Sequence, residues 1–364
     1  MRSNGFPGND NAAGRQGRVT SMARWLSRRR GAAPAPAPKL SVVIPVYNAE
    51  ATLKECLMRL YESRYRDFET VLVDDGCTDQ SPAIAAEFPV RIVPTSGRVG
   101  PAAARNLGAR MATGEILFFI DSDVMVRSDT LTVLAESFEG GDVDGLCGVQ
   151  AAQMRYTNIA SQYKNLWMRW TYLRQTGDVP LFYTTAAGIR REAFLRVGGF
   201  DQGYATPNVE DTAFGQKLAR LGVRVRVHPQ LEVEHVKQYS LWSMLSTDFV
   251  RAVSLTRLKL RHPGDLAQNN TSVPSSYMAS VPLSGAAGLF CLLGLALGLQ
   301  GMTAIGAACA AAVMGLNWEF LTAIRRSDGW PRVLAAIPVL WAELLVVGVG
   351  TAVGLVSYPF GRRY

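Results

Sequence analysis

Short apolar runs alternate with segments of helical spacing through the first half of the chain. The expected strands are residues 40–46, 70–73, 90–93 and 115–120, and the expected helices between them are residues 51–61 and 102–111. Strands of this kind that alternate with helices predict a mostly parallel sheet with helices on both faces. The fold class expected from the pattern is therefore α/β.

Polar side chains follow several of these strands. Tyr47 comes after the first strand, Asp74 and Asp75 come after the second, and Asp121 and Asp123 come after the strand over residues 115–120. Ligands of parallel sheets bind beyond the carboxyl ends of the strands. Because a buried carboxylate without a partner is costly, these acids either face water, as in a solvated strand exit, or hold something positive.

The pattern changes in the second half. Residues 241–262 mix apolar positions with arginine and lysine, which predicts an amphipathic helix in a membrane interface; a core helix of a soluble domain is the alternative. Residues 263–364 are expected to form a transmembrane region, because residues 266–318 contain no charged side chain. We expect spans at about residues 278–299, 301–321 and 333–356.

The charges around these spans favour a cytoplasmic catalytic half, since Arg325, Arg326 and Arg332 fall on the same side as Arg261. Three spans would place Arg362 and Arg363 outside, which a re-entrant segment would avoid. Glu343 lies inside the third apolar segment, where a charge is expensive and usually functional or paired.

Residues 1–38 read as a disordered basic leader that ends in an alternating Ala-Pro linker. Most of the excess positive charge lies there, so the remainder of the chain is nearly neutral. Beside membrane spans, an anionic lipid surface is a nearer partner for such a leader than nucleic acid, and we expect no nucleic-acid partner. The leader has no apolar stretch typical of a signal peptide, and Met22 is an alternative start.

The five cysteines are scattered without a CxxC pair, which gives no support to a disulfide framework or a zinc site. The expected organisation is the leader, a catalytic domain over residues 39–240, the interfacial helix and the membrane region. Together with the absence of a signal peptide, this predicts a multi-pass protein of the cytoplasmic membrane with its catalytic domain in the cytoplasm.

Ordered motifs identify the class of the catalytic domain. They are Leu40-Ser-Val-Val-Ile-Pro-Val-Tyr-Asn48, Val71-Leu-Val-Asp-Asp-Gly-Cys-Thr-Asp79, Gly100-Pro-Ala-Ala-Ala-Arg-Asn-Leu-Gly108, Asp121-Ser-Asp123 and Glu210-Asp211. In this order and spacing they resemble the family 2 glycosyltransferases. The resemblance covers about residues 39–240 and implies the GT-A fold, a Rossmann-like sheet that binds a nucleotide-sugar donor, linked to UDP or GDP.

The resemblance also implies roles on the donor side. Asp75 would read the nucleotide base with Asp74 beside it, because a carboxylate accepts the imide N–H of uracil. Pro45 and Tyr47 would line the same pocket through their backbone. The remaining donor-side residues are Arg98 and Arg105, which would face the diphosphate, and Asp121, which would lie nearer the ribose. A plain loop cation is the alternative for Arg98.

A divalent cation, Mn²⁺ or Mg²⁺, is the implied cofactor. Asp123 would offer oxygen to the metal, which bridges two phosphates. His235, in Val233-Glu-His-Val236, matches a C-terminal histidine that many GT-A enzymes use on the metal or the diphosphate.

The same resemblance assigns the general base to Asp211, which would take a proton from the acceptor hydroxyl as it attacks the sugar. One base without a second nucleophile predicts inversion. A helix N-terminus with first-turn charge is the alternative reading of Glu210-Asp211. Glu210, Gly188 and Gly199 would lie on the acceptor side, although tight turns explain the glycines equally well.

One departure from the family pattern bears on the product. Processive synthases carry Gln-x-x-Arg-Trp after the Glu-Asp, whereas this chain reads Asp248-Phe-Val-Arg-Ala252. Loss of the stacking tryptophan favours transfer of a single sugar by a membrane-bound, inverting hexosyltransferase of cell-envelope glycan or glycolipid synthesis. The expected acceptor is lipid-linked or presented at the bilayer. The alternatives are a processive polysaccharide synthase and a catalytically silent membrane scaffold that keeps the fold.

Overall fold

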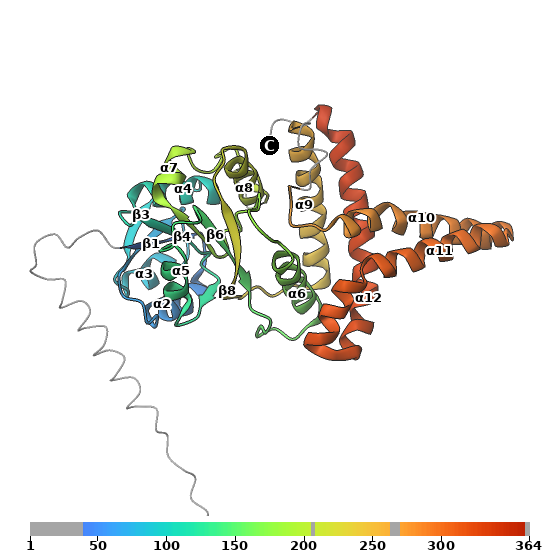
Figure 1. The fold of residues 1–364 in the computed structure, drawn as a ribbon, viewed down its shortest axis with the longest axis horizontal. Helices are drawn as coiled ribbons and strands as arrows, with labels where there is room; N and C mark the ends of the chain where they lie inside the picture. Colours follow the sequence, from blue (N-terminus) through green and yellow to red (C-terminus); the bar gives the residue numbers. More distant parts are fainter. Residues whose placement is uncertain (1–38, 205–207, 263–269, 361–364) are drawn as a thin grey trace, which may run out of the picture.

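The computed structural model describes residues 39–204, 208–262 and 270–360, and the predicted leader over residues 1–38 lies outside them. Its centre is a mixed eight-stranded sheet in the order β3-β2-β1-β4-β7-β6-β8-β5 (Figure 1). The strands are β1 (Leu40–Val46), β2 (Phe68–Asp74), β3 (Arg91–Pro94), β4 (Ile116–Phe119), β5 (Val124–Val126), β6 (Gly145–Gln150), β7 (Ala187–Arg190) and β8 (Val225–His235). Strands β1 to β4 pair in parallel, whereas β7 and β5 run against their neighbours.

Both faces of this sheet are covered by helices, as the alternating pattern predicts. In β1, Val42 and Ile44 join the core on one face, and Val43 joins the core on the other, which is the period-two alternation of a strand. The first face carries α2 (Glu50–Tyr61), α3 (Ser81–Ala86) and α5 (Thr130–Ser137), and the second carries α4 (Pro101–Met111), α7 (Arg191–Arg196) and α8 (Glu210–Arg220). The expected strands and helices are confirmed to within two residues at their ends.

The remaining helices form a separate body against the edge of the catalytic domain. They are α6 (Ile159–Leu173), α9 (Leu241–Arg261), α10 (Ser275–Leu297), α11 (Gln300–Leu316) and α12 (Trp318–Ser357), followed by a short 3₁₀ turn over Tyr358–Phe360. Figure 1 shows α9 beside α12, while α10 and α11 form a hairpin that projects away at a steep angle. Aromatic and aliphatic side chains from α6, α9, α10 and α12 share one apolar core.

The helix boundaries refine the predicted membrane region. The amphipathic helix agrees with α9, and both α10 and the helical stretch Trp318–Phe360 are long and apolar enough to cross a bilayer. The second predicted span, 301–321, does not correspond to one helix: α11 has 17 residues, and the chain turns at Asn317. Within α12, Gly329 has a φ of 77°, so the helix is kinked there.

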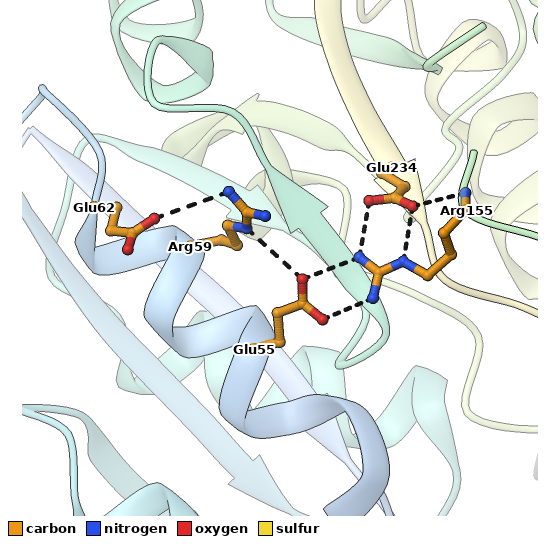
Figure 2. Close-up of polar contacts among 5 residues, drawn as sticks. All are labelled: Glu55, Arg59, Glu62, Arg155 and Glu234. Carbon is orange, nitrogen blue, oxygen red and sulfur yellow. Dashed lines mark hydrogen bonds and ion pairs between the residues drawn. The ribbon is translucent and has the colours of Figure 1, made fainter. Parts of the chain in front are cut away.

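A charged cluster fastens the end of the longest strand to α2 (Figure 2). Arg155 donates to both carboxylate oxygens of Glu55 at 2.7 and 3.0 Å, and to Glu234 in β8 at 2.9 Å. Arg59 lies on the same helix and pairs with Glu55 and Glu62. Hydrogen bonds from Arg155 hold the pKa of Glu234 below its ordinary value. Because His235 follows Glu234, this contact helps to fix the position of that imidazole.

Helix α8 packs directly against backbone. A Cβ atom at Gly215 would lie 2.6 Å from the carbonyl carbon and Cα of Leu181, and 2.7 Å from the nitrogen of Phe182. Only a residue without a side chain allows this approach. The approach sets the position of Glu210 and Asp211 in the first turn of α8.

Gly215→Ala is expected to lower the free energy of unfolding by roughly 1–3 kcal/mol, because overpacking against backbone outweighs the gain of about 1 kcal/mol in helix propensity. Thermal unfolding of the purified protein measures the change. Gly140→Ala is the matched control, since the nearest atom to its added Cβ is Asp142 Oδ2 at 3.9 Å. Equal stability of the two variants would contradict the close packing of α8.

Candidate functional site

A cavity of about 590 Å³ opens at the carboxyl ends of the central strands. Loops after β1, β2 and β4 form one side, and the first turn of α8 forms another. Side chains from α6 and α9 close the cavity opposite the strand ends. Of the predicted site residues, the cavity is lined by Pro45, Tyr47, Asp75, Arg98, Arg105, Asp121, Asp123, Glu210, Asp211 and His235.

Asp75 is a buried carboxylate that organises the loop before α4. It accepts hydrogen bonds from the backbone N–H groups of Val99 and Gly100 at 2.8 and 2.9 Å, and from the hydroxyl of Thr95 at 3.2 Å. The carboxylate therefore shapes one end of the cavity and borders it at the same time. Its neighbour Asp74 does not line the cavity, because it accepts the N–H of Cys77 in its own turn. Its assignment to the donor side beside Asp75 stays a prediction.

Arg98 and Tyr47 face each other at this end of the cavity. The guanidinium carbon of Arg98 lies 4.1 Å from the centre of the Tyr47 ring, a cation–π distance. Two flat groups, one cationic and one aromatic, suit a planar base or a phosphate near it. The position of Arg98 thus favours a binding role over that of a plain loop cation.

Arg105 is buried and committed to two acids. It donates to Asp121 Oδ1 at 2.7 Å and to Glu210 Oε1 at 3.0 Å. The predicted contact of Arg105 with a diphosphate is therefore not favoured, since both terminal nitrogens already bind carboxylates. Burial raises the pKa of Asp121 and outweighs the opposing charge of Arg105.

Asp123 and His235 meet where the antiparallel strands β5 and β8 pair. The Nε2 atom of His235 lies 3.3 Å from Asp123 Oδ2, and Nδ1 lies 3.3 Å from the side-chain amide of Gln150. Burial disfavours the Asp123 carboxylate, but the hydrogen bond and charge of His235 prevail, and the pKa of Asp123 lies below its ordinary value. The carboxylate of Asp123 and the imidazole of His235 therefore lie next to each other in the cavity wall.

Asp211 lies in the first turn of α8, with its carboxylate toward the cavity. Burial and the negative charge of Glu210 raise its pKa to about 6, against the opposing charge of Arg251 and a hydrogen bond from the Thr212 N–H. A carboxylate whose pKa approaches neutrality is a better proton acceptor than an ordinary aspartate. The geometry and the pKa both suit a general base.

The wall formed by α6 and α9 goes beyond the sequence prediction. Lys164 and Asn165 of α6, and Thr247 and Arg251 of α9, line the cavity. The Asp-x-x-Arg pattern at residues 248–251 was the available signal for α9, whereas nothing in α6 distinguishes its polar face from that of a solvated helix. Only the packing of the two helices against the sheet edge shows that they border the site.

Two predicted acceptor-side glycines do not reach the cavity. Gly188 lies in β7, where a Cβ would come within 2.6 Å of Leu134 Cδ1 in the core. Gly199 has a φ of +68°, and its Cβ would come within 2.3 Å of Asn106 Oδ1. Close packing and a left-handed turn account for these two glycines, and their assignment to the acceptor side stays a prediction. Thr184 and Thr185, which precede β7, line the cavity instead.

Named glycosyltransferases are similar to part of this chain. It is 34% identical to the glycosyltransferase GlyG of Streptococcus pneumoniae over 114 residues, which is 30% of this chain and 38% of that protein. It is 27% identical over 237 residues to the pre-mycofactocin glycosyltransferase of Mycobacterium tuberculosis, which is 63% of this chain and 49% of that protein. The chain thus spans less than half the length of these relatives.

A solved structure extends the likeness in fold. The mannosyltransferase PcManGT from Pyrobaculum calidifontis, determined in complex with GDP-Man and Mn²⁺, matches with a TM-score of 0.53 at 20% identity. The match covers 95% of this chain and 94% of the other. The model of the family described as Glycosyl transferase family 2 matches residues 41–198. Taken with the fold and the acids around the cavity, these matches show a domain similar to the family 2 glycosyltransferases over residues 41–198.

Proposed function

We propose that the protein is a membrane-bound, metal-dependent, inverting glycosyltransferase that moves a single sugar from a nucleotide-sugar donor to a lipid-linked acceptor. The observation that carries this proposal is one cavity bordered by Asp75, by the Asp123–His235 pair and by Asp211. One cavity thus holds residues that could bind the nucleotide, bind a cation and accept a proton. The donor would be a sugar linked to UDP or GDP.

The residues present fit a divalent cation that is shared with the substrate. Within residues 39–204, 208–262 and 270–360, no group of three or more His, Cys, Asp or Glu side chains converges on a single point, so the protein would supply only part of the ligand shell. Asp123 and His235 would hold the ion, and phosphate oxygens would complete its shell. Bound there, Mn²⁺ or Mg²⁺ would neutralise charge on the diphosphate.

Gln150 has a supporting role in that arrangement. Its side-chain amide lies against Nδ1 of His235 and the hydroxyl of Tyr183. In the structure the Gln150 amide nitrogen lies 3.3 Å from Nδ1 and donates to the Tyr183 hydroxyl. An amide turned by 180° would instead accept the Nδ1–H and leave Nε2 free for a metal, the usual arrangement around metal-binding histidines. The buried position of Gln150 keeps that partner in place.

Asp211 would receive the proton of the acceptor hydroxyl. The attacking oxygen then forms a bond to the anomeric carbon while the bond from that carbon to the diphosphate breaks, and the proton ends on the Asp211 carboxylate. Attack from the side opposite the departing group inverts the configuration. For an acceptor that is itself a phosphate, little proton removal is needed, and Asp211 would then mainly position the attacking oxygen.

The packing of α9 supports transfer of one sugar over polymerisation. Ala252 occupies the place of the tryptophan in processive enzymes, and it is 7% exposed. A Cβ added to Gly350 of α12 would come within 2.9 Å of the Ala252 Cβ, so α12 fills the space that an indole would need. The chain therefore has no stacking platform for a growing polymer at this position.

Asp211→Asn is expected to reduce sugar transfer at least 100-fold and to leave donor affinity within about twofold, because a general base contributes on the order of 10²–10⁴ to rate. Transfer assays with a labelled donor and calorimetric titration of the nucleotide sugar separate the two effects.

The same variant has an expected effect on stability. Since burial raises the pKa of Asp211, the ionised carboxylate destabilises the folded state above pH 6. Removing the charge should therefore not lower the melting temperature at pH 7.5. Retained turnover would overturn the assignment.

The pH profile of kcat/KM should show an acidic limb near pH 6, with activity lost as Asp211 is protonated. Arg251→Met removes a positive charge that lowers the pKa of Asp211, so the limb should move to higher pH. Arg226→Met is the control, because that arginine pairs with Asp178 outside the cavity and should leave the limb in place. If the acidic limb does not move in Arg251→Met, a group other than Asp211 causes the limb.

Asp123→Asn should remove most of the dependence of donor binding on Mn²⁺ or Mg²⁺, because the variant loses the carboxylate that pairs with His235. Donor-induced thermal stabilisation at increasing metal concentration is the measurement. Asp129→Asn, on the exposed loop before α5, serves as the control. A metal titration in Asp123→Asn equal to that of the unmodified protein would contradict the proposed cation site.

A further inference from the structure

We propose that the α10–α11 hairpin is the only part of the described chain that penetrates the bilayer beyond its interfacial layer, and that α12 lies in that layer, along the membrane surface beside α9. The hairpin enters from the side of the catalytic domain and returns to it. The end of α12 then stays on the catalytic side, although α12 is apolar enough to span. This inference rests on the membrane attachment in the proposed function and adds the arrangement of the helices.

The first argument is the position of Glu343 near the middle of the segment of α12 after its kink. Glu343 accepts a hydrogen bond from Tyr163 at 2.6 Å, and its carboxylate lies 3.7 Å from Lys164 Nζ. Lys164 also pairs with Asp248 and lines the cavity. If α12 crossed the bilayer, Glu343 would lie at mid-depth, and the cavity that must admit a water-soluble nucleotide sugar would lie there too.

The second argument is the contact of α9 along α12. A Cβ on Gly350 would come within 2.8 Å of the Phe249 carbonyl oxygen, and one on Gly354 within 3.0 Å of that of Val253, so the two backbones nearly touch. Arg257 donates to the Ser357 hydroxyl at 2.8 Å, and Tyr358 donates to the Leu260 carbonyl at 3.2 Å. The two helices are thus joined over several turns to the end of α12.

This contact makes a spanning α12 expensive, because α9 would be carried into the bilayer with it. The charged residues of α9 are Asp248, Arg251, Arg257, Lys259 and Arg261. Each charged side chain at the centre of a membrane helix costs about 2.5–3.5 kcal/mol. At the surface, α9 keeps its charged groups on the cavity or in water, and α12 contacts the acyl chains with one face only.

The outer face of α12 suits that position. Most of its exposed large apolar side chains recur on one side of the helix, at Leu334, Leu345, Val349, Val353 and Val356, while Leu355 lies off this stripe. At the kink, Trp330 is half exposed and lies under the guanidinium of Arg325, 5.3 Å from its ring centre. Tryptophan and arginine together are typical of the headgroup layer.

The hairpin suits insertion. Figure 1 shows it leaving the α9–α12 pair at a steep angle and pointing away from the catalytic domain. Its base is buried at Tyr277, Ser280 and Ser284, whereas Leu292, Leu295 and Leu297 near its tip are 62–73% exposed. From Gly285, just beyond that base, to Leu297 the helix rises about 18 Å, which is less than the hydrocarbon thickness of about 30 Å. The tip therefore ends inside the bilayer.

Cysteine accessibility in native membranes tests this arrangement. In a full-length background, Cys77, Cys291 and Cys309 are replaced by alanine, and the buried Cys56 and Cys147 are kept; this background without a further cysteine is the labelling blank. One cysteine is then added at Phe360, which is 87% exposed after α12, or at Leu297, near the hairpin tip. Leu221→Cys, exposed on the catalytic domain, marks the catalytic side. A membrane-impermeant maleimide is applied to sealed inverted vesicles and to intact spheroplasts from a bacterial expression host.

Phe360→Cys should be labelled at least tenfold more in inverted vesicles than in spheroplasts, as Leu221→Cys is, and Leu297→Cys should react from neither side until detergent is added. Labelling of Phe360→Cys from the spheroplast side would overturn the proposal, because α12 would then cross. Reaction of Leu297→Cys from either side would also overturn it, since the tip would lie beyond the bilayer or outside it. Sugar transfer is assayed on the same membranes: loss of transfer with the expected labelling counts against the proposed function alone.

Discussion

The site depends on one buried guanidinium. Arg105 reaches from α4 to Asp121, just after β4, and to Glu210, at the start of α8. Asp121 is two residues from Asp123, and Glu210 is next to Asp211, so a single side chain ties together the segments that carry the proposed cation ligand and the proposed proton acceptor. Breaking a buried pair of this kind costs about 3–5 kcal/mol, because the remaining charge is left without a partner. Displacing Asp121 or Glu210 from Arg105 is therefore energetically unfavourable.

A second charged cluster, around Lys164, fixes the opposite wall of the cavity in the same way. Lys164 of α6 pairs with Asp248 of α9 and lies near Glu343 of α12, so three helices are fixed around one ammonium group. Lys164 borders the cavity, while α12 presents its outer face to the surroundings. The cluster therefore links the α6–α9 wall of the cavity to the helices that we place at the membrane surface. An acceptor held in the bilayer would reach the sugar beside this wall.

The pattern along the chain was sufficient for the catalytic fold because its signals are local. Strand and helix periods in residues 40–120 arise from burial on two faces of one sheet, and α9 is evident from its mixture of apolar and basic positions. Local signals were not sufficient for the membrane region. Hydropathy cannot distinguish a helix that spans lipid from one that packs on α9 with one face and exposes apolar residues on the other, as α12 does.

The sequence by itself determined the family resemblance, the order of the acids and the identity of the chemical groups, since each motif is read from consecutive residues. Tertiary structure decided which of those groups share a cavity. Gly188 and Gly199 are explained by close packing, and Asp74 by a hydrogen bond within its own turn. Arg105 binds two carboxylates of the protein. In each case, contacts inside the protein compete with a ligand for the same groups. The wall of α6 and α9 exists only when distant segments meet, and although the Asp-x-x-Arg pattern marks α9, no pattern within α6 shows that it borders the cavity.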